Sequence, residues 1–253
     1  MDFQIDKIYN EDCLEGMKRI ADGAVDCIIT DLPYGTLAGN NEFTQWDEVI
    51  PFEPLWAQFH RVMKSNGVSV LFGQEPFSTR LRMSNFKEYK YDIIWVKNQA
   101  ANFANCRRQP MKYHENISVF YTKGATYNLP NLHKISPINS GRANKGGTSL
   151  RGFDNPKYQQ TESGFNESVV YFANTSSADS FHPTQKPVDL LRYLILTYSN
   201  EGDTILDATI GSGTTAVAAL MEHRHFIGFE TNKEYFDIAQ GRIDQVLRNP
   251  TLF

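Results

Sequence analysis

The chain has 253 residues, of which 41% are hydrophobic and 13% aromatic, and its formal net charge is −4. This length accommodates one large domain with an insertion, and the abundance of aromatic side chains excludes an intrinsically disordered chain. No apolar run approaches the roughly 18 residues of a membrane span, and the N-terminus has no basic region followed by an apolar one, so we expect neither a membrane segment nor a signal peptide.

Short hydrophobic runs alternate with helical periodicity along the first 123 residues. We expect strands at 5–9, 25–30, 68–72, 91–96 and 117–121, with helices at 14–20, 54–63 and 76–83. The pattern resumes near the C-terminus, with helices at 188–198, 214–222 and 233–247 and strands at 204–206 and 225–229. Alternation of this kind predicts an α/β fold with a parallel sheet covered on both faces.

The segment 124–181 has no such periodicity and is rich in Asn, Gly, Ser and Pro. A loop this long inside a compact domain is usually functional or disordered. Residues 97–160 contain ten Lys or Arg and two acids, whereas the rest of the chain has 15 basic and 27 acidic residues. An acidic body with a basic central segment favours a protein that binds a polyanion, and the alternative is a solvated basic loop.

A glycine-rich turn, Gly211-Ser212-Gly213, lies between a predicted strand and a predicted helix. Glycines let the backbone approach a ligand closely, and the helix N-terminus offers free N–H groups. One strand later Glu230 follows an apolar run, where a carboxylate can bind both hydroxyls of a ribose. The pattern indicates a nucleoside cofactor, and the glycine spacing departs from the dinucleotide fingerprint. The alternative is a turn that only caps the helix.

Asp31-Leu32-Pro33-Tyr34 follows the buried strand 25–30 and should lie at its C-terminal edge, where ligands bind in open α/β sheets. An amino nitrogen on an aromatic base is a poor nucleophile, because its lone pair is delocalised into the ring. The Asp31 carboxylate and the Leu32 carbonyl can accept its two hydrogens, and Tyr34 can stack on the base. The alternative is a tight turn with an incidental tyrosine.

Several segments together resemble the beta class of DNA amino-methyltransferases, and their adenine-N6 branch in particular. They are Asn10-Glu11-Asp12-Cys13, Asp31-Leu32-Pro33-Tyr34 in place of D-P-P-Y, Trp95-Val96-Lys97, His114-Glu115-Asn116-Ile117, His182-Pro183-Thr184-Gln185-Lys186-Pro187 and the glycine loop from Asp207 to Thr215. The resemblance implies a Rossmann-like S-adenosylmethionine-dependent methyltransferase fold with a circularly permuted motif order. It further implies a catalytic domain at 1–123 and 182–253 and a basic target-recognition insertion at 124–181.

Two residues depart from the family pattern: Leu32 replaces a proline, and Thr209 replaces a phenylalanine of the cofactor loop. We expect the chemistry to survive the first change, because the carbonyl is retained. The resemblance favours adenine N6, since cytosine-N4 enzymes typically have Ser in place of Asp31. Cytosine-C5 chemistry is disfavoured, because Cys13, Cys27 and Cys106 all lack a preceding proline. Three widely spaced cysteines also favour a reducing compartment.

The resemblance implies roles for individual residues. The catalytic set is Asp31, Leu32, Pro33 and Tyr34, and the S-adenosylmethionine site comprises Asp12, Cys13, Asp31, Lys186, Asp207, Thr209, Gly211, Ser212, Gly213, Thr214, Thr215 and Glu230. Lys186 would neutralise the cofactor carboxylate, Glu230 would hold the ribose and Asp12 would face the adenine. The DNA-binding candidates are Arg107, Arg108, Lys112, Arg142, Lys145 and Arg151. We expect no metal ion.

The partner implied by the resemblance is double-stranded DNA, with the target base flipped out of the helix. A homodimer and a cognate restriction endonuclease for the same site stay open, and we expect a cytoplasmic protein of bacterial or phage origin. Cytosine-N4 methylation, methylation of an RNA base or a protein amide, a catalytically inactive nucleic-acid binder and a nicotinamide oxidoreductase are the alternatives. The glycine spacing and the amino-group motif disfavour the last of these.

Overall fold

The computed structural model describes residues 4–36, 47–139, 159–174 and 185–248 of the chain. It divides into two compact units, one formed by residues 1–128 and 168–253 and the other by residues 129–167. Among the described residues, no helix combines the length and apolar character needed to cross a bilayer.

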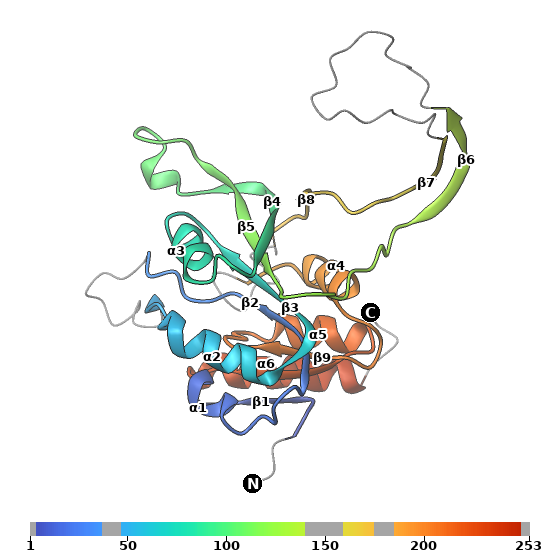
Figure 1. Cartoon of the computed structure of the whole chain (residues 1–253). Coiled ribbons are helices and arrows are strands. Elements are labelled where there is room, and N and C mark those ends of the chain that lie inside the picture. Colours follow the sequence, from blue (N-terminus) through green and yellow to red (C-terminus); the bar gives the residue numbers. More distant parts are fainter. Residues whose placement is uncertain (1–3, 37–46, 140–158, 175–184, 249–253) are drawn as a thin grey trace. The chain divides into compact units, whose positions relative to one another are not determined.

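The larger unit is built on an eight-stranded sheet (Figure 1). Its strands are β1 (Lys7–Tyr9), β2 (Val25–Thr30), β3 (Met63–Gly73), β4 (Tyr89–Ala101), β5 (Lys112–Phe120), β8 (Val169–Tyr171), β9 (Thr204–Asp207) and β10 (His225–Phe229). They follow the order β1-β10-β9-β2-β3-β5-β4-β8 across the sheet.

Helices cover both faces of this sheet. One face carries α1 (Cys13–Met17), α2 (Phe52–Val62) and α3 (Phe77–Ser84), and the other carries α4 (Val188–Tyr198), α5 (Thr214–Met221) and α6 (Lys233–Arg248). Side chains of β2 alternate between the two hydrophobic cores. Ile28 packs in the core of α1–α3, whereas Cys27 and Ile29 pack in the core of α4–α6. Burial on both sides explains the apolar run Cys27-Ile28-Ile29 within β2.

Capping positions fix where the helices near the sheet edge begin. The Asp12 side chain accepts hydrogen bonds from the backbone N–H groups of Leu14 (2.8 Å) and Glu15 (3.1 Å), which starts α1. Gly213 precedes α5 with φ 82° and ψ 20°, a left-handed conformation that favours glycine. α1 thus begins a few residues after the end of β1, and α5 begins after the glycine loop that follows β9.

The sheet is mixed, which corrects the prediction of a parallel sheet for one of its strands, β5. β1, β10, β9, β2 and β3 are parallel, whereas β5 pairs antiparallel with both β3 and β4. Only residues 102–111 connect β4 to β5, and a parallel pairing needs a longer crossover connection, usually with a helix. β4 and β5 therefore form a hairpin.

The segment predicted to lack periodicity contains three strands. In the smaller unit, β6 (His133–Asn139) pairs antiparallel with β7 (Gln159–Ser163), and in the larger unit β8 adds to β4. The described residues of β6 are mostly exposed, so neither face imposes the hydrophobic alternation on which a sequence prediction depends. The role of the segment 124–181 in target recognition stays a prediction.

Candidate functional site

Three parallel strands end at the same edge of the sheet. β2 pairs with β9 through Ile28 and Leu206, and β9 pairs with β10 through Asp207 and Gly228. The chain runs outward from β9 to β10 on one side and from β2 to β3 on the other, so the strand order reverses between β2 and β9. Ligands in open α/β sheets bind at such a reversal, beyond the carboxyl ends of the strands.

A cavity of about 870 Å³ opens at this edge. All four residues of the predicted amino-group pocket line it: Asp31, Leu32, Pro33 and Tyr34. The residues predicted to bind the cofactor line it as well, with one exception: Asp12, Cys13, Asp31, Lys186, Asp207, Thr209, Gly211, Ser212, Thr214, Thr215 and Glu230. The two predicted half-sites are therefore parts of one cavity, although most of the chain separates them in sequence.

The exception is Gly213, which is not among the lining residues of the cavity. Its φ is 82°, and a Cβ atom added there would lie 2.8 Å from the Cβ atom of Ala239 in α6. Glycine at this position is explained by backbone conformation and by the close packing of α5 on α6.

On the β9–β10 side of the cavity, two acids accept hydrogen bonds from neutral backbone and hydroxyl groups. Glu230 accepts hydrogen bonds from the backbone N–H groups of Gly211 (3.0 Å) and Asn232 (2.7 Å), and burial raises the pKa of its carboxyl. Asp207 accepts from Thr215 Oγ1 (2.6 Å) and Thr209 N (3.1 Å), and burial raises its pKa to about 6. Each carboxylate fixes the conformation of the glycine loop.

The α1 side of the cavity presents Asp12 and Cys13. Asp12 caps α1 through one carboxylate oxygen and also lines the cavity. Burial raises the pKa of the Cys13 thiol to about 12, so this thiol stays neutral at physiological pH. Cys13 can therefore contact a ligand by packing or as a weak hydrogen-bonding group.

Eight acids and two lysines are found among the residues that line the cavity. The acids are Glu11, Asp12, Asp31, Asp47, Glu48, Glu115, Asp207 and Glu230, and the lysines are Lys112 and Lys186. Such a lining favours a ligand that carries positive charge.

Asp31 lies at the centre of a cluster of charged and polar groups. Its carboxylate accepts a hydrogen bond from the Tyr34 hydroxyl (2.5 Å) and pairs with the Lys186 ammonium. Loss of hydration raises the pKa of Asp31, an effect that Lys186 opposes and that repulsion from Glu115 reinforces. Asp31 is thus a better proton acceptor than an ordinary exposed carboxylate.

Glu115 connects this cluster to β4 and β5. One of its carboxylate oxygens lies 3.4 Å from Lys186 Nζ, and the other pairs with Lys97 at the end of the buried part of β4. Burial alone would raise the pKa of Glu115, but Lys186 and Lys97 together lower it. The resemblance pointed to the segments that contain Lys97 and Glu115 without giving either residue a role in the site.

Lys186 is buried, and the carboxylates of Asp31 and Glu115 raise its pKa although burial alone would lower it. These contacts compete with the role predicted for Lys186, which is to neutralise the carboxylate of the cofactor. That role stays a prediction. In the structure, the ammonium of Lys186 holds Asp31 in place.

The turn at Tyr34 is held by a buried acid that the sequence analysis missed. Asp47, which is 3% exposed, accepts hydrogen bonds from the backbone N–H groups of Tyr34 (2.8 Å) and Gly35 (3.0 Å). The Tyr34 ring packs on Phe77, with 5.0 Å between ring centroids. No periodic pattern marks Asp47, so the sequence carries no signal that would have found it.

Thr209 links the two sides of the cavity. Its hydroxyl donates to the backbone carbonyl of Asp31 (3.0 Å) and lies 2.9 Å from the Thr30 hydroxyl. The hydroxyl of Thr209, the residue at which the family resemblance led us to expect phenylalanine, thus joins the glycine loop to the segment that carries Asp31.

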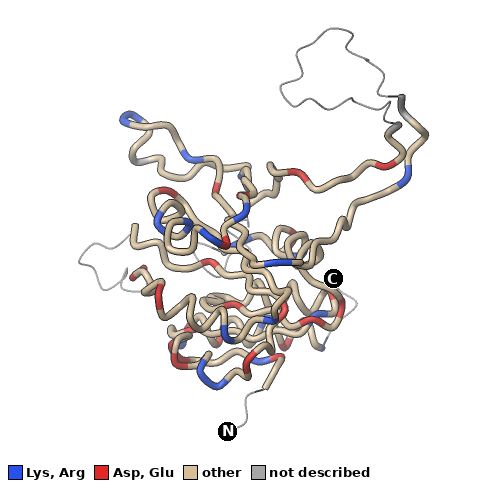
Figure 2. Tube along the Cα trace, viewed as in Figure 1, with Lys and Arg blue, Asp and Glu red and all other residues tan. Residues whose placement is uncertain are grey.

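The predicted DNA-binding residues fall in two groups. Arg107 and Arg108 are exposed on the connection between β4 and β5, and Lys112 begins β5 and lines the cavity. Figure 2 shows this basic connection at the outer end of the hairpin. Arg142, Lys145 and Arg151 lie outside the described residues, as does the His182–Thr184 part of the motif before α4.

Comparison with known proteins identifies relatives over nearly the whole chain. The model of the DNA methylase family matches residues 25–241. Type II methyltransferase M.HpaI of Haemophilus parainfluenzae is 28% identical over 94% of this chain and 74% of its own length. Type II methyltransferase M.HinfI of Haemophilus influenzae is 27% identical over 97% of this chain and 70% of its own length.

Solved structures share the fold. The crystal structure of the M1.HpyAVI–SAM complex superposes with a TM-score of 0.63 at 25% identity, covering 94% of this chain and 98% of the other. The cytosine-N4-specific PvuII DNA methyltransferase superposes with a TM-score of 0.65 at 14% identity, covering 96% and 91%. These likenesses agree with the Rossmann-like methyltransferase fold predicted from the sequence.

Proposed function

This chain belongs to the DNA methylase family and is an S-adenosylmethionine-dependent DNA methyltransferase, and we propose that it methylates N6 of adenine at a specific site in double-stranded DNA. One observation carries the proposal: Asp31, Leu32 and Tyr34, which would hold the amino group and the ring of the base, all line the cavity. The aspartate at position 31 supports adenine, because related cytosine-N4 enzymes typically carry serine there.

The residues around the cavity fit the cofactor. S-adenosylmethionine supplies an electrophilic methyl group bonded to a cationic sulfur. The acid-rich lining suits its positive charges, and Glu230 keeps lone pairs that can accept hydrogen bonds from ribose hydroxyls. We assign the loop from Gly211 to Thr214 to the amino-acid end of the cofactor and Asp12 to its adenine.

The substrate base enters the other side of the cavity. A target adenine cannot reach Asp31 from inside a duplex, so it flips out, which costs a few kcal/mol. The Asp31 carboxylate and the Leu32 carbonyl accept one N6 hydrogen each, and the Tyr34 ring stacks on the base. This arrangement frees the N6 lone pair and aligns it for a direct displacement, in which orientation supplies most of the rate enhancement.

Asp31 also receives the proton that the reaction releases. As N6 forms its bond to the methyl carbon, the carbon–sulfur bond breaks and the nitrogen acquires a positive charge. The carboxylate of Asp31 then accepts one N6 proton. Its pKa is raised by loss of hydration, which favours this transfer, and Lys186 keeps the carboxylate positioned.

Nucleoside mass spectrometry tests the proposal. Unmethylated DNA is incubated with the protein and S-adenosylmethionine, and the digested nucleosides are analysed. N6-methyladenine is the expected product. N4-methylcytosine would contradict the choice of base while retaining the mechanism. If no methylated nucleoside appears although the cofactor binds, DNA is not the substrate and the proposal fails.

A further inference from the structure

Residues at the outer end of the β4–β5 hairpin line part of the cavity. The connection 102–111 begins with Asn102, which adopts a left-handed conformation (φ 68°, ψ 34°) and precedes the short 3-10 helix η2 (Phe103–Asn105). Side chains three residues apart share one face of a 3-10 helix. Accordingly, Asn105 Nδ2 donates to Asn102 Oδ1 (2.7 Å), and both residues line the cavity.

Phe103 follows Asn102 and is the first residue of η2. Its side chain is therefore turned about a third of a helical turn away from the face that Asn102 and Asn105 share. It is 77% exposed, the highest value among the large hydrophobic side chains that the structure describes, and it is not part of the cavity lining. An aromatic side chain therefore projects beside the mouth of the cavity without entering it.

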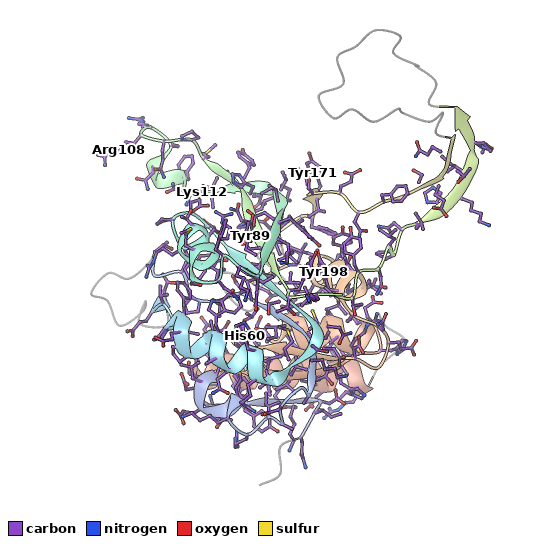
Figure 3. The ribbon with its side chains drawn as sticks, viewed as in Figure 1. His60, Tyr89, Arg108, Lys112, Tyr171 and Tyr198 are labelled. Atoms are coloured by element: carbon purple, nitrogen blue, oxygen red, sulfur yellow. The ribbon has the colours of Figure 1, made fainter. Side chains whose placement is uncertain are left out.

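The hairpin around Phe103 is basic. Residues 98–114 include Arg107, Arg108 and Lys112 and contain no acid. Arg107 and Arg108 are exposed, and Figure 3 shows Arg108 at the outer end of the hairpin, with Lys112 nearer the body of the unit. Two exposed guanidinium groups on the same connection as an exposed aromatic side chain can bind phosphates next to the base step that the ring contacts.

We propose that Phe103 is the wedge that fills the gap left in the DNA stack by the flipped base. This inference rests on the proposed function, because it requires a target base in the cavity. With that base held inside the mouth, its former position in the duplex lies outside the mouth, beside Asn102 and Asn105. The ring of Phe103 stacks there between the neighbouring bases and stabilises the open duplex. Arg107 and Arg108 bind the flanking phosphates.

The role of Phe103 is tested by comparing activity on a duplex whose target base is paired with activity on a duplex whose target base is unpaired. The target site is first located by sequencing DNA that the wild-type enzyme has methylated. Two duplexes with this site are then compared, one fully paired and one with an abasic position opposite the target base. Phe103→Ala should lower kcat/KM about tenfold to a hundredfold on the paired duplex. On the abasic duplex, the kcat/KM of Phe103→Ala should be close to that of the wild type, because no base pair has to be broken. Phe103→Trp should keep activity on both.

Phe86→Ala is the matched control. Phe86 is 68% exposed and lies beside the other end of β4, so its removal should change neither rate. Calorimetric titration with S-adenosylmethionine verifies that each variant is folded.

Two results overturn the inference. An unchanged rate of Phe103→Ala on the paired duplex shows that no wedge is needed, and an equal loss on both duplexes shows that Phe103 contacts the target base or the phosphates instead. Absence of any methylated site in the sequencing step overturns the proposed function itself, and with it this inference.

Discussion

The two sides of the cavity satisfy their buried acids in different ways. On the β9–β10 side, Asp207 and Glu230 accept hydrogen bonds from neutral backbone N–H and hydroxyl groups. On the β2 side, Asp31 and Glu115 are held by Lys186 and Lys97, which come from other elements. Lys186 lies 155 residues from Asp31 in sequence.

This difference suggests that the two sides have different roles, cofactor binding on the β9–β10 side and methyl transfer on the β2 side. Neutral donors fix the shape of the β9–β10 side and leave carboxylate lone pairs free for a ligand. The lysines on the β2 side set the charge and position of one proton acceptor, and a change in either lysine or in Glu115 alters that acceptor. Substitutions on the β9–β10 side should therefore change the affinity for the cofactor, and substitutions on the β2 side should change the rate of methyl transfer.

The largest effect on cofactor binding is expected for Glu230→Ala, which removes the carboxylate assigned to the ribose hydroxyls. Loss of two charged hydrogen bonds should weaken cofactor binding by about 3 kcal/mol or more, a Kd increase on the order of a hundredfold. Calorimetric titration measures Kd, and kcat at saturating cofactor should change little. Glu234→Ala, on the exposed first turn of α6, is the control. An unchanged Kd in Glu230→Ala would remove Glu230 from the binding side.

Asp207→Asn should alter the pH dependence of stability. Asp207 has a folded-state pKa of about 6 against 3.8 for an ordinary aspartate, so its stabilising contribution is complete below 3.8 and lost as the pH rises through 6. The wild type should lose about 3 kcal/mol of unfolding free energy relative to Asp207→Asn across this range. Urea denaturation of both proteins at several pH values measures the difference. Parallel curves would show that Asp207 is not buried as a carboxylic acid.

Glu115→Gln should slow methyl transfer roughly tenfold and leave cofactor Kd unchanged. Without the charge of Glu115, Lys186 interacts with Asp31 alone, and the pKa of Asp31 falls. The carboxylate becomes a weaker proton acceptor, and the acid limb of the pH–rate profile moves to lower pH.

Glu75→Gln, which removes the half-exposed partner of Arg82, provides the comparison, since it should move neither kcat nor the pH profile. If Glu115→Gln has the wild-type kcat and the wild-type pH profile, the β2 side does not depend on this carboxylate.

Thr209→Val tests the link between the two sides and should have the smallest effect. The substitution keeps the volume of the side chain and removes the hydroxyl that donates to the Asp31 carbonyl. We expect kcat to fall about threefold, below 1 kcal/mol, because one neutral hydrogen bond is lost. Single-turnover transfer measures the change, with Thr79→Val on α3 as the control. A higher Kd for the cofactor with an unchanged kcat would instead place Thr209 on the side of the cavity that binds the cofactor.

Sequence patterns predicted most accurately the elements that lie within the hydrophobic cores. The bounds predicted for β2, α4 and β10 coincide with those in the structure. The hairpin strands were predicted too short, at 91–96 and 117–121 instead of 89–101 and 112–120. Their outer ends leave the core, so their side chains have no reason to alternate between apolar and polar.

The same reasoning applies to the site. The glycine loop, Glu230 and Asp31 through Tyr34 follow strand ends, and strand ends can be located from local hydrophobicity. The contacts of Lys97, Glu115 and Asp47 depend on which strands become neighbours and on how their side chains turn. A local pattern contains neither piece of information.

The central claim is that Asp31 serves transfer and not cofactor binding, and Asp31→Ala tests it directly. Cofactor Kd and single-turnover methyl transfer are measured on the same preparation. We predict an unchanged Kd together with a loss of transfer on the order of a thousandfold or more. Substantial transfer by this variant, or a loss of transfer that follows entirely from lost cofactor binding, would contradict the account.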